Sequence, residues 1–452
     1  MLDSKIRSIM RKLHIFAILL SFATIFTSCD GFLDIVPTGR VIPKTHEEFR
    51  ALLATAYNNF PKDRGLATFR TDETRMNTTS EFDINNFRDI YLWNDTNPLT
   101  STFPFKWLDY YEVIFVCNHI IQEQNNVKEA TTEQINQLVG EAYMLRAYTY
   151  FTLANLFAQP YEANQAESIP AVPLNLDNDT DAVLPKSSLA KVYGQINSDI
   201  KEGLDRLNVK DQTTENNYRF STNSGRALQL RVALYQQKWT EAITVGKELL
   251  ANTNKTLSDL NKSTKIEPSS FDSDENLLAL ELVLPSDYSR ALYLSDKLRD
   301  SYDTNDQRLK RYFKAVTKYT YTIKKAGSTK YRCTFRLGEV YLSLAEASAK
   351  NNNIDDAKQY LKTLLQNRLR STLFEAESNK IDALSGDDLM EYILNERFKE
   401  LAFEGHRWFD LRRTNQEAIN HTFDGQTYTL KQNDNRYTLP IPQEARLNNP
   451  NL

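Results

Sequence analysis

The stretch Asn395-Glu-Arg-Phe-Lys-Glu-Leu-Ala-Phe-Glu-Gly-His-Arg-Trp-Phe-Asp-Leu-Arg-Arg413 mixes acidic, basic and aromatic residues in an unusual density. Glu396, Glu400 and Glu404 recur at every fourth position, so they share one face of a helix. A surface helix would carry such charges without the aromatic residues, and a core helix would carry the aromatic residues without the charges. The pattern therefore predicts a helix and a following turn that ion pairs hold inside the protein.

The three glutamates could also be the paired carboxylates of a glycosidase, which cleaves a sugar between two acids and needs one of them protonated. Several arginines lie close by in the sequence, and they would keep the carboxylates ionised, which disfavours a general acid. A structural ion-pair network is the better interpretation. We expect its members to be Glu396, Arg397, Glu400, Glu404, Arg407 and Asp410, with Arg412 and Arg413 as further bases.

The N-terminus resembles a secretory signal followed by a lipidation site. Four basic residues precede an apolar run from Leu13 to Phe26, which is too short for a membrane span of about 20 residues. Thr27 and Ser28 then lead to Cys29, as at a lipoprotein cleavage site. We predict that residues 1–28 are a signal peptide and that Cys29 is lipidated; an ordinary secreted chain is the alternative.

Charge argues against nucleic acid as a partner. The chain has 55 Lys and Arg against 59 Asp and Glu, and without residues 1–28 the balance is 51 against 58, or −7. An acidic chain without a long basic stripe is a poor match for a phosphate backbone.

Few glycines, 13 in 452 residues, and long amphipathic runs predict a mainly α-helical protein. Thr45 to Glu48 reads as a capping box for a helix over 45–60, and Ser188 as the cap of a helix that reaches Leu207. Residues 61–106 look irregular. Pairs of helices resembling tetratricopeptide units are predicted near 107–157, 224–251, 336–366 and 387–413. About four such hairpins would stack into a right-handed arc within a single domain over 29–452.

Catalytic and metal motifs are absent from the sequence. It contains no GxSxG, HExxH or glycine-rich phosphate loop. Asp177, Asp179 and Asp181 alternate as in a calcium loop, but Ala182 stands where that loop needs its glycine, so we read a solvated loop. We expect no metal site and no cofactor. Apart from Cys29 the cysteines are Cys117 and Cys333, which we expect to be buried thiols, with a disulfide as the alternative.

The 395–413 stretch closely resembles the C-terminal signature of the SusD/RagB family of outer-membrane nutrient-binding lipoproteins. Three further segments are similar to that family: Asp30 to Pro37 at the start of the mature chain, Leu298 to Arg308, and Tyr437 to Leu452. The resemblance thus runs over almost the whole chain after Cys29.

This resemblance implies a SusD-like fold, with helical hairpins and irregular ligand-binding insertions, and no enzyme activity. It implies a lipid-anchored, surface-exposed protein of the outer membrane that captures an oligosaccharide or a peptide. The captured ligand would pass to a SusC-like TonB-dependent transporter. The family leaves room for a calcium ion that assists binding.

Aromatic residues in the irregular segments are the expected ligand contacts, because sugar C–H faces stack on aromatic rings while hydroxyl groups pair with polar side chains. One such segment runs from Asp72 to Phe105 and another from Tyr288 to Tyr321. For each single residue, packing in the core is the competing interpretation. The candidates are Trp93, Tyr91, Asp72, Tyr288 and Tyr302, with Trp93 first.

A protein-interaction scaffold on the outer membrane is the alternative function, because tetratricopeptide arcs commonly bind other proteins. The lipidation site and the 395–413 signature favour the nutrient-binding interpretation.

Overall fold

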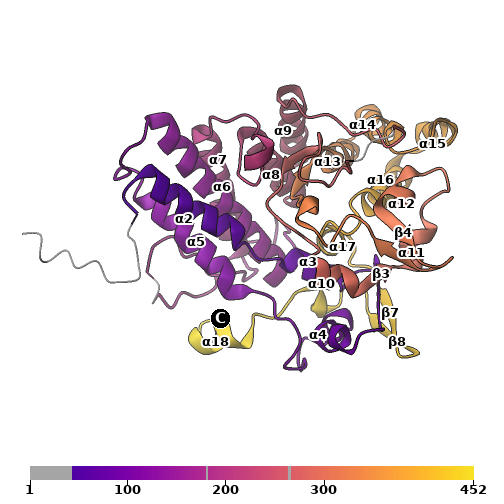
Figure 1. Cartoon of the computed structure of the whole chain (residues 1–452), viewed down its shortest axis with the longest axis horizontal. Helices are drawn as coiled ribbons and strands as arrows, with labels where there is room; N and C mark the ends of the chain where they lie inside the picture. Colours follow the sequence, from indigo (N-terminus) through magenta and orange to yellow (C-terminus); the bar gives the residue numbers. More distant parts are fainter. Residues whose placement is uncertain (1–42, 180–181, 263–265) are drawn as a thin grey trace, which may run out of the picture. The chain divides into compact units, whose positions relative to one another are not determined.

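A computed structural model describes residues 43–179, 182–262 and 266–452 (Figure 1). The predicted signal peptide, Cys29 and Asp181 lie outside these ranges. Residues 44–452 form one compact unit. None of the helices in the described ranges is both long and apolar enough to cross a membrane.

Long helices make up most of this unit, and their starts follow the capping residues in the sequence. Thr45 and Glu48 form the predicted capping box of α2, Thr131 caps α6, and Ser188 caps α7. In each case the side-chain oxygen accepts a hydrogen bond from a backbone N–H of the first turn, which otherwise has no partner. The long helices are α2 (His46–Asn58), α5 (Trp107–Gln122), α6 (Thr132–Phe157), α7 (Leu189–Arg206), α8 (Thr222–Tyr235), α9 (Trp239–Asn252), α13 (Leu337–Lys350), α14 (Ile354–Gln366), α15 (Ser371–Ala383) and α16 (Gly386–Glu400).

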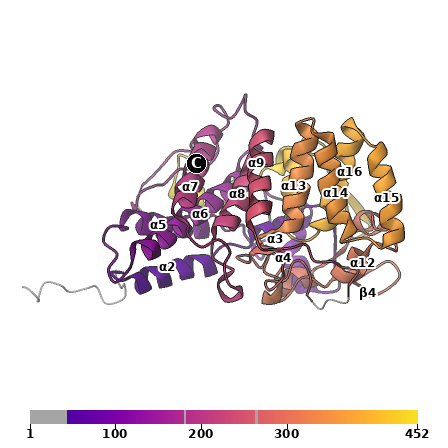
Figure 2. The ribbon, with the colours of Figure 1, turned by 90° about the horizontal axis from the view of Figure 1, so that it is seen from above.

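Three of the predicted helical pairs are present: α5 packs on α6, α8 on α9, and α13 on α14. In Figure 2 the long helices α7, α8, α9, α13, α14 and α15 follow one another across the molecule, and each is in contact with the next. The stacking into a right-handed arc stays a prediction.

The fourth predicted pair, over 387–413, is not a hairpin of two long helices. α16 ends at Glu400, and only the short helix α17 (Arg407–Arg413) follows. The turn between them contains Phe403 and Gly405, both with positive φ, which no α-helix can accommodate. At Gly405 a Cβ would also lie 3.0 Å from side-chain carbons of Arg64 and Val283.

The expectation that 61–106 is irregular is wrong. This segment contains α3 (Asp63–Thr68), β1 (Thr74–Met76) and α4 (Glu81–Tyr91). Ser80 caps α4 by accepting from the Asp83 N–H, a local signal that the polar composition of the segment masked.

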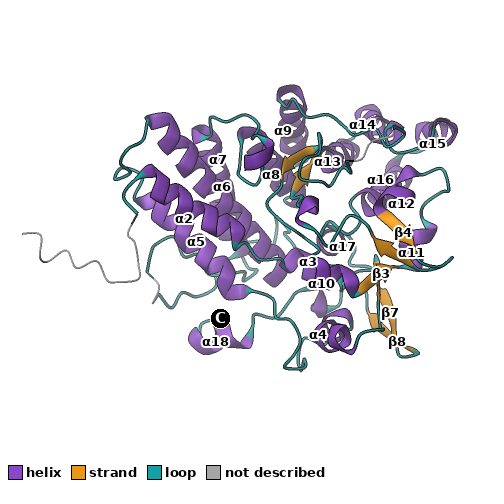
Figure 3. Cartoon of the chain, viewed as in Figure 1, coloured by secondary structure: helices purple, strands orange, loops and turns teal. Residues whose placement is uncertain are grey.

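The strands are short and pair in twos, each pair antiparallel (Figure 3). β1 pairs with β3 (Leu292–Leu294), β2 (Asn276–Leu278) with β6 (Phe335–Arg336), β4 (Phe313–Ala315) with β5 (Tyr321–Ile323), and β7 (Ile419–Phe423) with β8 (Gln426–Leu430). Four short helices lie among them or after them: α10 (Ser286–Arg290), α11 (Asp296–Asp300), α12 (Gln307–Tyr312) and α18 (Gln443–Asn448).

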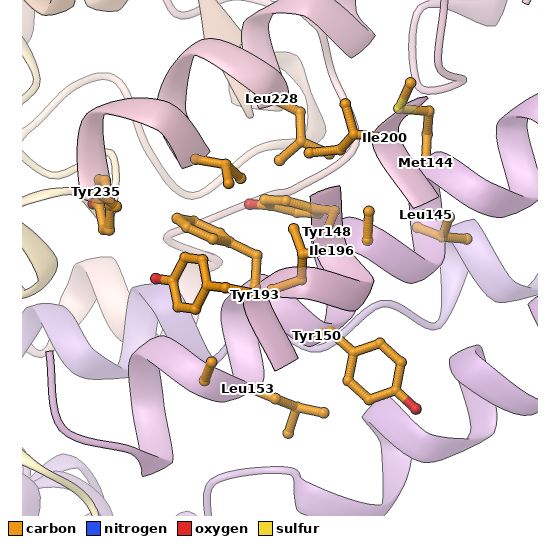
Figure 4. Packing of buried hydrophobic residues seen from close by; sticks show 14 of the residues in the cluster. Met144, Leu145, Tyr148, Tyr150, Leu153, Tyr193, Ile196, Ile200, Leu228 and Tyr235 are labelled. Carbon is orange, nitrogen blue, oxygen red and sulfur yellow. The ribbon is translucent and has the colours of Figure 1, made fainter. Parts of the chain in front are cut away.

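The largest core cluster lies between the helices, where α6 is buried along almost its full length. Small residues let α7 and α8 approach α6 closely: a Cβ at Gly203 or at Gly225 would lie 2.9 Å from the Met144 Cε. Cys117 and Cys333 are buried free thiols, as expected. Figure 4 shows the packing of Met144, Leu145, Tyr148, Tyr150 and Leu153 from α6, Tyr193, Ile196 and Ile200 from α7, and Leu228 and Tyr235 from α8.

Candidate functional site

The glutamates of the 395–413 stretch lie in a buried cluster of ion pairs, which we call the Glu400 network. Glu400 is at its centre, with carboxylate oxygens 2.6 Å from Arg336 Nη1, 3.0 Å from Arg368 Nε and 3.4 Å from Arg308 Nη1. Formally the network holds five acids and five bases, so its charges balance. Its members are Glu275, Asp306, Arg308, Lys325, Arg336, Arg368, Glu396, Lys399, Glu400 and Glu404.

Burial by itself would raise the pKa of Glu400, but the guanidinium groups of Arg368, Arg336 and Arg308 outweigh it and hold that pKa well below the usual range. The pKa values of Glu396 and Glu404 are lowered for the same reason, again against the effect of burial. These carboxylates are ionised at neutral pH and cannot act as a general acid.

The sequence argument placed the wrong arginines beside these glutamates. Arg308, Arg336 and Arg368, which hold Glu400, come from distant segments that only the fold brings together. Arg397 pairs instead with Asp410 at 3.2 Å, and Arg413 with Asp410 and Glu346.

Arg412 has a different set of partners, because its guanidinium donates to the carbonyl oxygens of Asn155, Ala158 and Tyr437. Arg407 forms a bidentate pair with Asp72, at 2.7 Å for both bonds.

Trp93 and Tyr91, two of the predicted ligand contacts, lie inside the protein. Trp93 is 1% exposed, and its indole N–H donates to the Arg70 carbonyl at 3.1 Å. The His421 ring lies stacked between Tyr91 and Trp93, with centroid distances of 3.9 and 4.3 Å. The ring faces are therefore covered by protein, and a ligand could reach them only after a rearrangement.

Asp72 and Tyr302 are also buried. Burial would raise the pKa of Asp72, but Arg407 and Lys297 outweigh it and lower that pKa to about 2. The Tyr302 hydroxyl donates to the Lys399 carbonyl at 2.7 Å. Both side chains are thus committed to contacts inside the protein.

Tyr288 is half-buried at α10, where its ring packs edge-on against Phe69 and Phe87. Of the five candidates it is the one with a substantially exposed surface.

The two predicted ligand-binding segments do meet, but at other residues. Strand β1 of the first segment pairs with β3 of the second, and β5 lies beside β3. The first and last residues of β1 and β3 are buried, whereas the central residues Arg75 and Tyr293, which lie opposite each other, are half-exposed. This alternation turns Arg75 and Tyr293 to the same, outer face of the strand pair.

We call the surface around this pair the Arg75 face; it comprises Arg75, Tyr293, Arg299, Tyr319 and Thr320. The Arg75 guanidinium lies 5.6 Å from the Tyr293 ring centroid and donates to the Thr320 hydroxyl at 3.1 Å. Its Nε is buried and makes no hydrogen bond within the described residues. Arg299 lies over the Tyr319 ring at 5.5 Å, and Tyr319 is 58% exposed.

This face combines open aromatic surface with guanidinium and hydroxyl groups, which suits a ligand with both apolar faces and hydroxyl groups. Sequence reasoning singled out the segments but not these residues. The sequence around Arg75 carries no local signal of this role, because its pairing with Tyr293 depends on the fold.

A metal centre finds no support in the structure. Within residues 43–179, 182–262 and 266–452, no three His, Cys, Asp or Glu residues are grouped so that they could hold a metal ion.

Two family models match separate parts of the chain. Residues 288–452 match the family model described as the SusD family. Residues 31–234 match a related model described as starch-binding associating with outer membrane. A curated relative, the SusD-like protein P38 of Formosa agariphila, is 24% identical over 88% of this chain and 90% of its own length.

Solved structures share the fold. A SusD superfamily protein from Bacteroides fragilis superimposes with a TM-score of 0.76 at 23% identity, over 90% of this chain and 99% of that one. A structure described as a laminarin-binding SusD-like protein gives a TM-score of 0.61 at 22% identity, over 82% of this chain and 92% of that one. The signature stretch, the fold and the two family models agree, and the chain belongs to the SusD family.

Proposed function

We propose that this protein is a lipid-anchored binding protein on the outer-membrane surface that captures an oligosaccharide at the Arg75 face. It then delivers the oligosaccharide to a SusC-like TonB-dependent transporter. The SusD family comprises carbohydrate-binding, non-catalytic proteins, and the mechanism is accordingly one of binding and transfer, with no bond made or broken.

The observation that carries this proposal is the meeting of the two aromatic segments at Arg75 and Tyr293. In this arrangement the exposed Tyr319 ring stacks on a sugar C–H face. The half-exposed Arg75 guanidinium donates to sugar hydroxyls beside that ring.

An oligosaccharide fits this face better than a peptide. The β1 and β3 strands are paired with each other, and their outward side chains rather than open backbone edges form the face. Peptides that add a strand need such an open edge. Two descriptions also support a glycan: the family model that residues 31–234 match is described as starch-binding, and one of the similar solved structures as laminarin-binding.

Cys29 anchors the protein in this proposal, and residues 1–28 direct its export. The proposal places the transporter contact outside the Arg75 face, so that a bound glycan and the partner do not compete. Co-purification of a barrel protein from outer membranes, with and without Arg75→Ala, tests this division: the partner should be retained by both.

The binding test is a glycan array followed by titration of the full chain purified in detergent. The panel includes malto-oligosaccharides and laminarin oligosaccharides. Tyr319→Ala and Arg75→Ala should each weaken binding of the best glycan about tenfold, since a well-placed aromatic contact contributes about 0.5–1.5 kcal/mol and a hydrogen bond to a charged group about 1.5–3 kcal/mol. Phe115→Ala removes another exposed aromatic ring, on α5, and should leave affinity unchanged. Equal effects of Phe115→Ala and Tyr319→Ala would refute the site.

A further inference from the structure

An open hollow with a volume of about 510 Å³ lies where the connection between α14 and α15 meets α12. This volume is within the range of small-molecule sites in proteins. We call it the amide hollow, because three of its seven lining residues carry side-chain amides. The lining consists of Asn261, Gln307, Gln366, Leu369, Arg370, Ser371 and Phe374. None of these residues belongs to the Arg75 face.

Most of the polar side chains around the hollow have no partner among the residues that the structure describes. The side chains of Gln307, Gln366, Arg370 and Ser371 make no hydrogen bond or ion pair with any residue in the described ranges. Asn261 is the exception, since its amide donates to the Gln366 and Leu369 carbonyls. Hydrogen-bond donors and acceptors therefore lie next to one another around the hollow.

The walls of the hollow are fixed from two sides by the backbone. Gln307 N–H donates to the Arg368 carbonyl at 3.0 Å, and Leu260 N–H donates to the Asn367 carbonyl at 2.9 Å. Arg370 N–H donates to the Asn305 carbonyl at 3.1 Å. The connection between α14 and α15 is thus tied both to the segment before α12 and to the segment around Asn261.

The Glu400 network holds the same walls from behind. Arg308 directly follows the lining residue Gln307, and Arg368 directly precedes the lining residue Leu369. Both arginines are fully buried. Both guanidinium groups end on Glu400, and Arg308 also reaches Glu396 at 2.8 Å. The two glutamates of the signature helix α16 therefore fix the position of Gln307 and of the Gln366–Arg370 connection, so the hollow does not depend on loop packing alone.

We propose that the amide hollow is a second glycan-binding site, separate from the Arg75 face. The amides of Gln307 and Gln366 each offer a donor and an acceptor to neighbouring sugar hydroxyls, Arg370 adds a planar set of donors, and Phe374 offers an apolar surface for a C–H face. No carboxylate lines the hollow, so a cation is not its ligand. The choice of a glycan rests on the proposed function.

Saturation-transfer NMR on the full chain in detergent tests the second site, because it detects weak binding. The probes are the malto-oligosaccharides and laminarin oligosaccharides of the array, together with any better glycan found there. Binding is first measured in the Arg75→Ala/Tyr319→Ala variant, in which the Arg75 face is disabled. Gln307→Ala and Gln366→Ala are then added to that variant. The matched control is Gln359→Ala, which removes an exposed amide from the same helix α14 outside the hollow.

We expect residual transfer to a glycan in the Arg75→Ala/Tyr319→Ala variant, a loss of at least tenfold in affinity on adding both hollow substitutions, and no change with Gln359→Ala. Loss of all transfer in the Arg75→Ala/Tyr319→Ala variant would overturn the second site and leave the proposed function standing. Residual transfer that survives the hollow substitutions would do the same. Tighter binding of short peptides than of glycans at the hollow would overturn its ligand class. A wild-type chain that binds no glycan at all would remove both proposals.

Discussion

The Glu400 network makes a sharp prediction for Glu400→Gln, a substitution that keeps the shape of the side chain and removes its charge. Glu400 is fully buried and accepts from three guanidinium groups. The network has five acids and five bases, so the substitution leaves one excess positive charge inside the protein. The remaining acids cannot compensate, because each is already within 3.4 Å of a base.

Removing one partner of a buried ion pair typically costs about 3–5 kcal/mol, since the other charge stays buried without compensation. The glutamine oxygen still accepts one hydrogen bond, which places Glu400→Gln towards the lower part of that range, at about 3 kcal/mol. An exposed pair offers the comparison: Lys201 and Asp205 have side chains 73% and 57% exposed. Water screens such a pair, so Asp205→Asn should leave the free energy of unfolding almost unchanged.

Urea unfolding of the full chain, followed by tryptophan fluorescence and circular dichroism, measures both variants. The chain has four tryptophans, and Trp93 and Trp408 are buried, so unfolding changes the surroundings of their rings. We expect a clear drop of the unfolding midpoint for Glu400→Gln and almost none for Asp205→Asn. Equal, small effects of the two substitutions would refute the reasoning that the network holds the fold.

Three further predictions follow from single buried contacts. Arg407→Ala leaves Lys297 as the remaining ion-pair partner of the Asp72 carboxylate, so it should lower the free energy of unfolding by about 3 kcal/mol. An unchanged melting temperature together with lost glycan binding would instead place Arg407 in the binding site. Gly405→Ala places a Cβ at positive φ against two side-chain carbons at 3.0 Å and should cost about 2 kcal/mol in urea unfolding, whereas Gly194→Ala, where a Cβ meets nothing, should cost nothing. Burial raises the pKa of Glu73 to about 8, so the folded state keeps a proton there that the unfolded state loses above about 4.5. The stability of the wild type should therefore fall relative to that of Glu73→Gln as pH rises from about 4.5 to 8, by roughly 3–5 kcal/mol in all. A difference in stability between the two proteins that stays constant with pH would contradict the raised pKa.

Local signals in the sequence predicted the helices well. Capping residues such as Thr131 and Ser188 act within one turn, so the starts of α6 and α7 can be read without knowledge of the fold. The local composition of α6 likewise predicts, without knowledge of the fold, that this helix is buried. These signals do not extend to the strands, because β1 and β3 have three residues each and each pairs with a segment far away in the sequence.

The candidate site was harder to predict because its contacts are long-range. Trp93 sits among polar residues in the sequence, yet His421 from the far end of the chain covers its ring. Arg75 has no unusual neighbours, and its position depends on Tyr293 and Thr320. In the same way, local arginines suggested an ion-pair network of the right kind, while the fold supplied other arginines to build it.

The most direct test of the account is a crystal structure of the protein with the oligosaccharide that binds best on the array. We predict sugar density against the Tyr319 ring, with at least one hydroxyl within hydrogen-bond distance of the Arg75 guanidinium. Density elsewhere with the Arg75 face empty, or a glycan seated only after Trp93 has left the core, would contradict the account.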